Sequence, residues 1–276
     1  YDAEGLDVTI KPGGPDIAPA QVLAGGGADV MVDWMPSALA AREKGLPLVN
    51  IAQPFKSSGM MLTCRKDMGV NSTDDLKGKT LGVWFYGNEY PFLSWMSRLG
   101  LATDGSANGV TVLKQGWGVE PLTEGQAACV STMSYNEYWV VRDAGYTPEQ
   151  LTVFKYQAEG ASTLEDGLYV LEKNLADDSF KDKMVRFVRA SMKGWKYAEA
   201  NPKEAASIIL DNDDAGVQTE KHQIRMMGEI AKLTAGSNGS LDPSDYERTV
   251  KVLMSGASDP VITKEPSGAW THDITN

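Results

Sequence analysis

The chain has 276 residues, and its 26 Lys and Arg residues stand against 37 Asp and Glu residues, which leaves a formal net charge of −11. This acidity argues against nucleic acid and anionic membrane surfaces as partners, because both bind clustered cations. No apolar run approaches the roughly 20 residues that cross a bilayer. The length exceeds that of a usual single domain, so two α/β lobes are predicted.

The first quarter of the chain alternates apolar runs with helical segments. Residues 6–10 alternate apolar and polar side chains, as a strand does, and the three glycines at 25–27 stop a preceding helix. The pattern predicts strands at 6–10, 28–32, 48–52 and 59–65, and helices at 18–24 and 36–44.

The middle of the chain continues this alternation. A polar cap and an acidic first turn predict a short helix at 71–76, and Pro91 favours a helix start after the strand that precedes it. The predicted strands are 79–84, 110–113, 127–132 and 151–154, and the predicted helices are 71–76, 91–99 and 119–123.

The last third is mostly helical, since Phe180, Met184, Phe187 and Met192 recur at helical spacing. Helices are predicted from 178 onward and at 202–210, 219–233 and 243–256, after a strand at 167–171. Strands that alternate with helices predict mainly parallel sheets. The long apolar strands 59–65 and 167–171 would pass between the lobes as a hinge, with lobe I formed by 1–62 and 166–276 and lobe II by 63–165.

Two loops that leave predicted strands combine aromatic rings with one acid. Ligands of open α/β sheets bind at such carboxyl ends. The first loop offers Trp84, Tyr86 and Glu89, and the second offers a stacking face, an amide and a carboxylate. Together they predict a site for a small, flat, polar ring, and the second set is the strongest candidate: Tyr135, Asn136 and Glu137.

Other candidate ligand-binding residues follow further strands or precede the crossover strands, and each has a plain structural alternative. A tryptophan after a strand packs under a helix as often as it contacts ligand. An acid in a crossover segment either faces ligand or only braces the hinge, and Glu89 could simply favour its helix start. These further candidates are Trp34, Ser57, Ser58, Trp117, Glu165 and Asp166.

The cysteines and histidines do not indicate a metal site. Cys64 and Cys129 lie in apolar, strand-like runs, which favours two buried free thiols, with a disulfide as the alternative. His222 and His272 are far from both cysteines, so no metal ligand spacing arises. The chain contains no Walker loop, dinucleotide fingerprint or serine-hydrolase elbow, and neither an enzyme nor a cofactor is expected.

Several segments resemble one family of binding proteins. Residues 1–8 (YDAEGLDV) and 21–30 (QVLAGGGADV) resemble its opening segments, and 74–83 (DDLKGKTLGV) resembles a motif of many two-lobed binding proteins. Residues 135–138 (YNEY) and 164–168 (LEDGL) are more specific to one branch. On these motifs the whole chain resembles the substrate-binding proteins of ABC importers in the NMT1/THI5-like group, without that family's opening strand and helix.

The resemblance implies a type II periplasmic binding protein fold and a monomer that delivers a thiamine-precursor pyrimidine to the membrane subunits of an importer. It also implies a periplasmic location, or an extracellular one with a membrane anchor. Other flat heterocycles, such as flavin, hydantoin or purine rings, suit the same residues. A sulfonate- or nitrate-binding relative is the rival, and a pyrimidine synthase-like enzyme is a weaker one because the clustered cysteines of that chemistry are absent.

Overall fold

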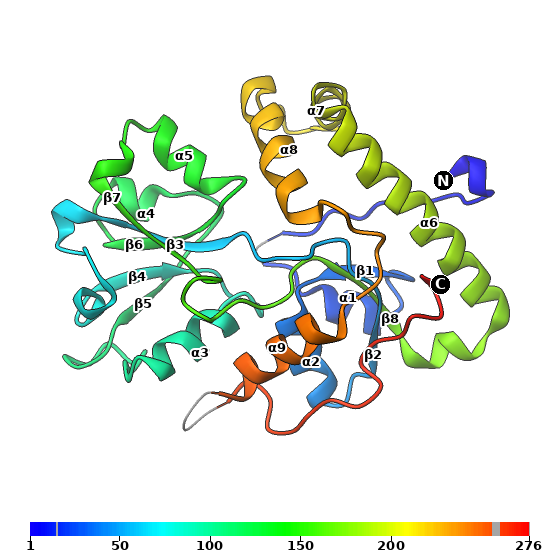
Figure 1. The fold of residues 1–276 in the computed structure, drawn as a ribbon, viewed down its shortest axis with the longest axis horizontal. Coiled ribbons are helices and arrows are strands. Elements are labelled where there is room, and N and C mark those ends of the chain that lie inside the picture. Colours follow the sequence, from blue (N-terminus) through cyan, green and yellow to red (C-terminus); the bar gives the residue numbers. More distant parts are fainter. Residues whose placement is uncertain (15, 256–259, 276) are drawn as a thin grey trace.

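Two β-sheets, each flanked by helices, organise the chain (Figure 1). The computed structural model describes residues 1–14, 16–255 and 260–275. Within them β1, β8 and β2 form a small sheet, and β5, β4, β6, β3 and β7 form a large sheet, in these orders. We call the half that carries the small sheet lobe I and the other half lobe II. The strands are β1 (Met31–Asp33), β2 (Leu48–Ala52), β3 (Met60–Arg65), β4 (Thr80–Val83), β5 (Thr111–Lys114), β6 (Cys129–Met133), β7 (Leu151–Lys155) and β8 (Gly167–Leu171).

Most helices lie close to their predicted positions, but residues 137–143, where no helix was predicted, also form one. They are α1 (Pro19–Ala24), α2 (Met35–Glu43), α3 (Tyr90–Arg98), α4 (Glu120–Thr123), α5 (Glu137–Asp143), α6 (Asp178–Ala200), α7 (Pro202–Asp211), α8 (Glu220–Thr234) and α9 (Pro243–Met254). The segment predicted as a short helix at 71–76 is a 3-10 turn, and residue 256, the predicted end of the last helix, lies outside the described residues. Further 3-10 turns are Asp2–Glu4, Lys66–Met68, Pro148–Gln150 and Glu172–Ala176.

The prediction of mainly parallel sheets was wrong for the crossover strands. Strands joined through helices do run parallel, as β4 does with β5 and with β6. In contrast, β3 pairs antiparallel with β6 and β7, and β8 pairs antiparallel with β1 and β2. These two strands were predicted to pass between the lobes, but each lies within one sheet and directly follows a segment that makes the connection. Each inserts between strands that run in the opposite direction, so the large sheet is mixed and the small sheet is antiparallel.

The strand predicted at 6–10 is absent. These residues are not helical or sheet-like, and the side chain of Ile10 is 80% exposed. Alternating polarity suits a strand, but a strand also needs a neighbour to accept its backbone hydrogen bonds. No strand of the described residues pairs with this segment. Alternating polarity alone was therefore not enough to form a strand here.

Helix α6 covers the small sheet. Asp177 caps its start by accepting a hydrogen bond from the backbone N–H of Ser179, 2.8 Å away. Its inner side chains, Met184, Val188 and Met192, pack against residues of β2 and β8. The helical spacing of the apolar residues therefore did identify the buried face.

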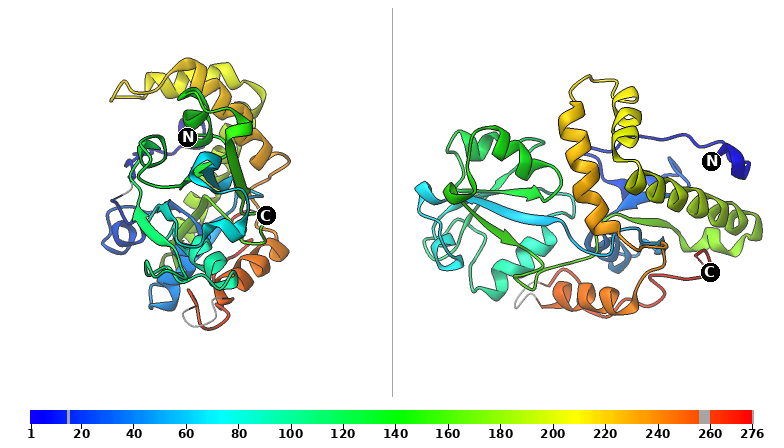
Figure 2. Two further views of the ribbon diagram at one scale, coloured as in Figure 1. Left: turned by 90° about the vertical axis from the view of Figure 1, so that its left-hand side faces the viewer. Right: turned by 45° about the horizontal axis from the view of Figure 1, so that its top comes forward.

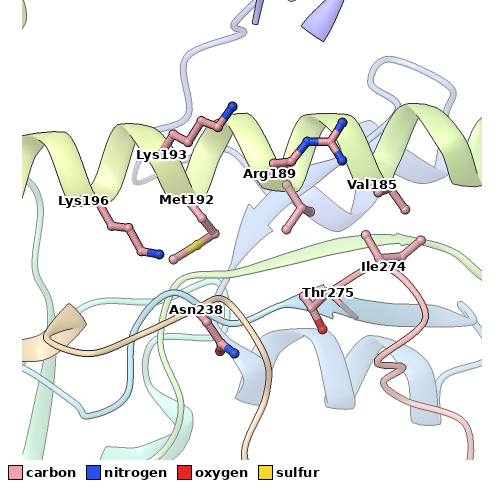
Figure 3. A pocket seen from close by; sticks show the side chains of 9 residues that line it. Val185, Arg189, Met192, Lys193, Lys196, Asn238, Ile274 and Thr275 are labelled. Carbon is pink, nitrogen blue, oxygen red and sulfur yellow. The ribbon is translucent and has the colours of Figure 1, made fainter.

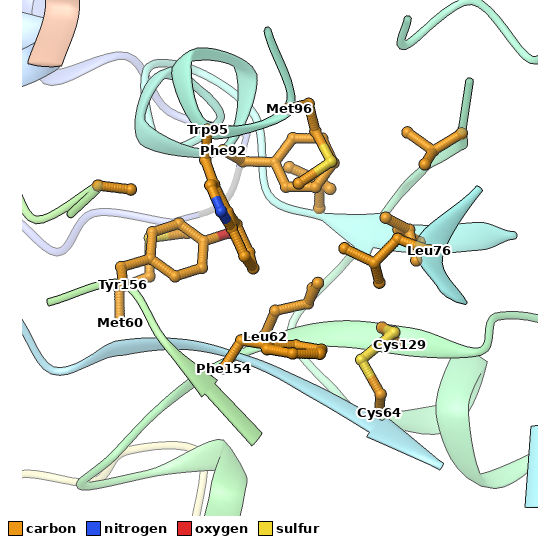
Figure 4. Close-up of a cluster of buried hydrophobic side chains, with 14 of the residues drawn as sticks. Met60, Leu62, Cys64, Leu76, Phe92, Trp95, Met96, Cys129, Phe154 and Tyr156 are labelled. Atoms are coloured by element: carbon orange, nitrogen blue, oxygen red, sulfur yellow. A yellow bond between two sulfur atoms is a disulfide. The ribbon is translucent and has the colours of Figure 1, made fainter. Parts of the chain in front are cut away.

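Lobe II has its own core between β3 and α3. Trp95 of α3 packs against Phe154 and Tyr156, with ring centroids 5.7 and 5.2 Å apart (Figure 4). Cys64 and Cys129 face each other on β3 and β6 and form a disulfide. The favoured prediction of two free thiols was wrong, because pairing of two strands brings together residues that are 65 positions apart in sequence.

Candidate functional site

The two segments that link the lobes meet around Glu165, which is 1% exposed. Its carboxylate accepts hydrogen bonds from the hydroxyl of Ser58 and from the backbone N–H groups of Gly59 (3.1 Å) and Met60 (3.2 Å). The side-chain amide of Gln53 donates to the backbone carbonyl of the same glutamate. Glu165 therefore braces the hinge by tying the linker before β3 to the linker before β8.

Asp166, the next residue, lies at the junction with Trp34. Its backbone has a φ of 27°, in the left-handed region that residues other than glycine seldom adopt. The side chain of Trp34 is close enough to the Asp166 carboxyl to lower its pKa, against the larger effect of burial, which raises it. The indole also packs against the core of lobe II, although Trp34 begins α2 in lobe I. Trp34 thus spans the junction beside an acid that is held in a strained backbone.

Asp33 adds a third acid to this junction. Its carboxylate accepts hydrogen bonds from the backbone N–H of Trp34 (2.8 Å) and from the hydroxyl of Ser37 (3.0 Å). The position at the end of β1 brings it close enough to Asp166 for the two charges to repel.

Burial raises the pKa of all three carboxyl groups. The pKa of Asp33 rises to about 7, that of Glu165 to about 8 and that of Asp166 to about 6, with burial as the largest cause in each case. The negative charge of Asp166 raises the first two further. No Lys or Arg of the described residues contributes to these shifts. The junction consequently favours a ligand that brings hydrogen-bond donors or positive charge.

Tyr135 follows β6 of lobe II and lies near these acids. Its ring is half-buried, 6.4 Å from the ring of Phe55, and packs against the lobe II core. Burial and then the charge of Asp166 raise the pKa of its phenol. The structure thus places a neutral aromatic ring beside several carboxyl groups, and its use as a stacking surface for a ligand stays a prediction.

Asn136 and Glu137 are held by hydrogen bonds within the protein. The Glu137 carboxylate accepts from the backbone N–H of Met133 (2.9 Å) and from the side-chain amide of Asn136 (2.8 Å). The carbonyl oxygen of Asn136 lies 2.7 Å from Nε2 of His222, which is on α8. Burial raises the pKa of Glu137. Both side chains therefore have partners within the protein, and their contacts with ligand stay predictions.

The first aromatic loop is held mainly by its own lobe. The indole N–H of Trp84 donates to the carbonyl of Gly116 at 3.0 Å, and Glu89 accepts from the backbone N–H of Gly87 at 2.7 Å. Tyr86 is 45% exposed, with the ammonium of Lys114 4.8 Å from its ring centroid. Trp84 packs against the core of lobe II. Trp117 is 74% exposed, and Ser57 is half-buried in the linker before β3.

This loop approaches lobe I closely at Gly87. Gly87 has a φ of 108°, and a Cβ atom on it would lie 2.5 Å from Cβ of Ser37 on α2. Only glycine leaves room there, and the same backbone angle also favours it. Because Ser37 donates to Asp33, this approach brings the first loop against the acidic junction.

A separate cavity of about 320 Å³ lies in lobe I (Figure 3). It shares no residue with the predicted site. Val185, Met192 and Ile274 give it apolar walls, and two of its cationic side chains, Arg189 and Lys193, pair with Glu4. The single carboxylate of Glu4 offsets only one of these two positive charges, so the cavity stays positively charged. Because none of its lining residues was predicted to bind ligand, the junction remains the candidate site.

Sequence reasoning missed Asp33, Ser37 and His222. Asp33 had a local signal, since an acid directly follows the apolar residues of a strand and precedes the candidate Trp34. His222 had none, because it lies 86 residues from Asn136 and reaches it only through tertiary structure.

Comparisons with known proteins agree on one family and one fold. A family model described as NMT1/THI5 like matches residues 1–205. The formylaminopyrimidine-binding protein of Halalkalibacterium halodurans is 24% identical over 280 residues, which cover 98% of this chain and 83% of that protein.

Solved structures show the same architecture. A structure from Bordetella bronchiseptica RB50 has a TM-score of 0.73 at 20% identity and covers 99% of this chain and 87% of its own. The periplasmic aliphatic sulphonate-binding protein of Escherichia coli has a TM-score of 0.61 at 12% identity, with coverage of 86% and 71%. The two-lobed periplasmic binding protein fold expected from the sequence is therefore confirmed.

Proposed function

Because the chain belongs to the NMT1/THI5-like family, we propose that it is an extracytoplasmic solute-binding protein of an ABC importer. Its ligand is a small, flat nitrogen heterocycle held between the lobes, and a thiamine-precursor pyrimidine is the best candidate. The relative from H. halodurans is a formylaminopyrimidine-binding protein, which supports this ligand class. The observation that carries it in this chain is the junction of three carboxyl groups with Trp34 and Tyr135.

An aminopyrimidine suits that junction chemically. Its ring can stack on the Tyr135 or Trp34 face, and its amino group and any protonated ring nitrogen can donate to Asp166 or Asp33. A sulfonate or nitrate has the opposite requirement, because an anion would meet carboxylates there without a cation to offset them. The acids therefore favour the heterocycle over the sulfonate alternative.

The lobe boundaries and the cellular location are part of the same proposal. Since β3 pairs in the large sheet from Met60 onward, we place the first crossing within 53–59 and the second within 156–166. The Cys64–Cys129 disulfide supports an oxidising, extracytoplasmic compartment, where such bonds persist. Among the described residues no helix is both long and apolar enough to cross a membrane. The partners would be the ligand and the importer's membrane subunits, with the protein acting as a monomer.

Titration calorimetry of the purified protein with formylaminopyrimidine, an aliphatic sulfonate and nitrate tests the ligand class. We expect heat and thermal stabilisation with formylaminopyrimidine alone. A ligand at 100 times its Kd adds about 2.7 kcal/mol to the free energy of unfolding, which a thermal scan detects readily. Binding of the sulfonate in preference to any heterocycle would overturn the proposal.

A second measurement separates a binding protein from an enzyme. Ligand recovered after the complex is unfolded should be chemically unchanged, both without additions and with iron or pyridoxal phosphate present. Recovery of an altered pyrimidine would support the synthase-like alternative instead.

A further inference from the structure

Helix α8 belongs to lobe I but reaches lobe II. It packs against α6 and α7, and its last turn is tied to the first linker, where the backbone N–H of Lys56 donates to the carbonyl of Leu233 at 2.9 Å. Its other end lies near α5 of lobe II, as Figures 1 and 2 show. One rigid helix thus joins the hinge to the far lobe.

Ionic contacts connect the two helices. The guanidinium of Arg225 on α8 pairs with both carboxylate oxygens of Asp143 on α5, at 2.9 and 3.4 Å. The same guanidinium lies 4.7 Å from the ring centroid of Trp139, and Lys221 is 3.6 Å from Asp143. The Arg225 side chain is 21% exposed, so solvent screens this pair less than a fully exposed one.

A chain of hydrogen bonds runs from α8 to the end of β6. Glu137 accepts from Met133 N–H and from the Asn136 amide, which turns the Asn136 carbonyl oxygen toward His222. An amide oxygen cannot donate, so Nε2 of His222 must carry the hydrogen in this bond. His222 therefore fixes the orientation of the Asn136 side chain next to Tyr135.

We propose that α8 is a closure latch in which His222 is the positioning residue: it holds the 135–137 loop in its binding orientation only when the lobes are closed, while Arg225 secures the contact with α5. An interaction that exists only in the closed state raises the population of that state, and it strengthens ligand binding by the same factor when the free protein is mostly open. The role of the latch in ligand binding rests on the proposed function. Its contacts lie within the protein, so closure can be measured without ligand.

The decisive variants are His222→Phe and His222→Gln. Phe removes the donor, whereas the amide of Gln can donate from nearly the same place. Single-molecule energy transfer between dyes on the two lobes reports the closed fraction without ligand, and calorimetry reports the Kd for formylaminopyrimidine. We expect His222→Phe to lower the closed fraction and to raise that Kd about tenfold, the effect of one lost hydrogen bond, and His222→Gln to restore most of both.

His272→Phe is the matched control. The Nε2 atom of His272 lies 2.8 Å from the carbonyl of Leu241, a contact within lobe I. Its loss should alter unfolding but leave the closed fraction unchanged. If His222→Phe closes as the wild type does, the latch is refuted. If no heterocycle binds and yet His222→Phe opens the free protein, the latch stands and the proposed ligand fails.

A double-mutant cycle tests the ionic part. Arg225→Met and Asp143→Asn should each reduce the closed fraction, with a coupling of about 3- to 10-fold in the closing equilibrium that weakens at high salt. Arg248→Met removes a comparable pair that lies within α9 and should change nothing in closure. Additive effects of the Arg225 and Asp143 variants would exclude the pair from the latch.

Discussion

Two loops of lobe II, residues 84–89 and 134–137, look alike in sequence and differ in the structure. Each leaves a strand of the large sheet and combines aromatic rings with an acid. In the first loop Glu89 accepts a hydrogen bond from its own turn and Tyr86 is exposed. In the second loop Glu137 belongs to a chain of hydrogen bonds that ends at His222 on α8 of the other lobe. The same residue types thus have different roles in the two loops. The difference arises because His222 of lobe I contacts only the second loop through this chain of hydrogen bonds.

The largest expected effect comes from filling the space at Gly87, where the first loop approaches Ser37 of lobe I. Gly87→Ala places a Cβ 2.5 Å from Cβ of Ser37 and forces a residue with a side chain to keep a φ of 108°. Strain and overpacking together should cost about 2–5 kcal/mol of the closed state. Urea unfolding and the interlobe energy transfer described above measure it.

Gly145→Ala is its matched control, since Gly145 has a φ of 101° and nothing near its Cβ position. It should show only the cost of the backbone strain, with the lobes still closed. Equal effects of the two variants on closure would mean that the approach to Ser37 is unimportant.

The two acids provide the next comparison. Glu137→Gln leaves a single acceptor for two donors and turns an N–H group toward one of them, so it should cost about 1.5–3 kcal/mol in the free energy of unfolding. Glu89→Gln keeps the one acceptor that Gly87 needs and should cost below about 1 kcal/mol. Chemical unfolding measures both. If Glu137→Gln weakens ligand binding without lowering stability, Glu137 contacts the ligand directly.

Stacking separates the tyrosines of the two loops. Tyr135→Ala should weaken binding of formylaminopyrimidine by about 1–3 kcal/mol, as loss of base–aromatic stacking does, and Tyr135→Phe should cost less. Tyr86→Ala should have little effect, because its ring is largely exposed beside Lys114. If calorimetry shows that Tyr86→Ala weakens binding more than Tyr135→Ala does, the stacking surface lies in the first loop.

The last effect concerns the pH dependence of stability in the absence of ligand, measured one pH unit at a time. Because the pKa of Asp33 is raised to about 7 in the folded protein, the folded state binds more protons than the unfolded state between pH 4 and 7. Stability should therefore fall as the pH rises through this range, by about 1 kcal/mol between pH 6 and 7 for this group. Unfolding of wild type and Asp33→Asn at pH 5, 6, 7 and 8 isolates the contribution. A parallel pH profile for the two proteins would contradict the raised pKa.

The sequence by itself determined most secondary structure, the two-lobed fold and one strong group of candidate site residues. Local patterns suffice for these features, because apolar spacing, caps and glycine stops act within a few residues, as in α6 and α1. The exception, the strand predicted at 6–10, shows the limit of such patterns, since a strand exists only with a neighbour.

Tertiary structure alone decided the contacts between distant residues. It paired Cys64 with Cys129, turned β3 and β8 antiparallel to their neighbours, and placed three acids with raised pKa values at one junction. It also brought His222 to Asn136. The physical reason is common to all of them: burial and partner geometry depend on which segments meet across the lobes, and that information is absent from any short stretch of sequence.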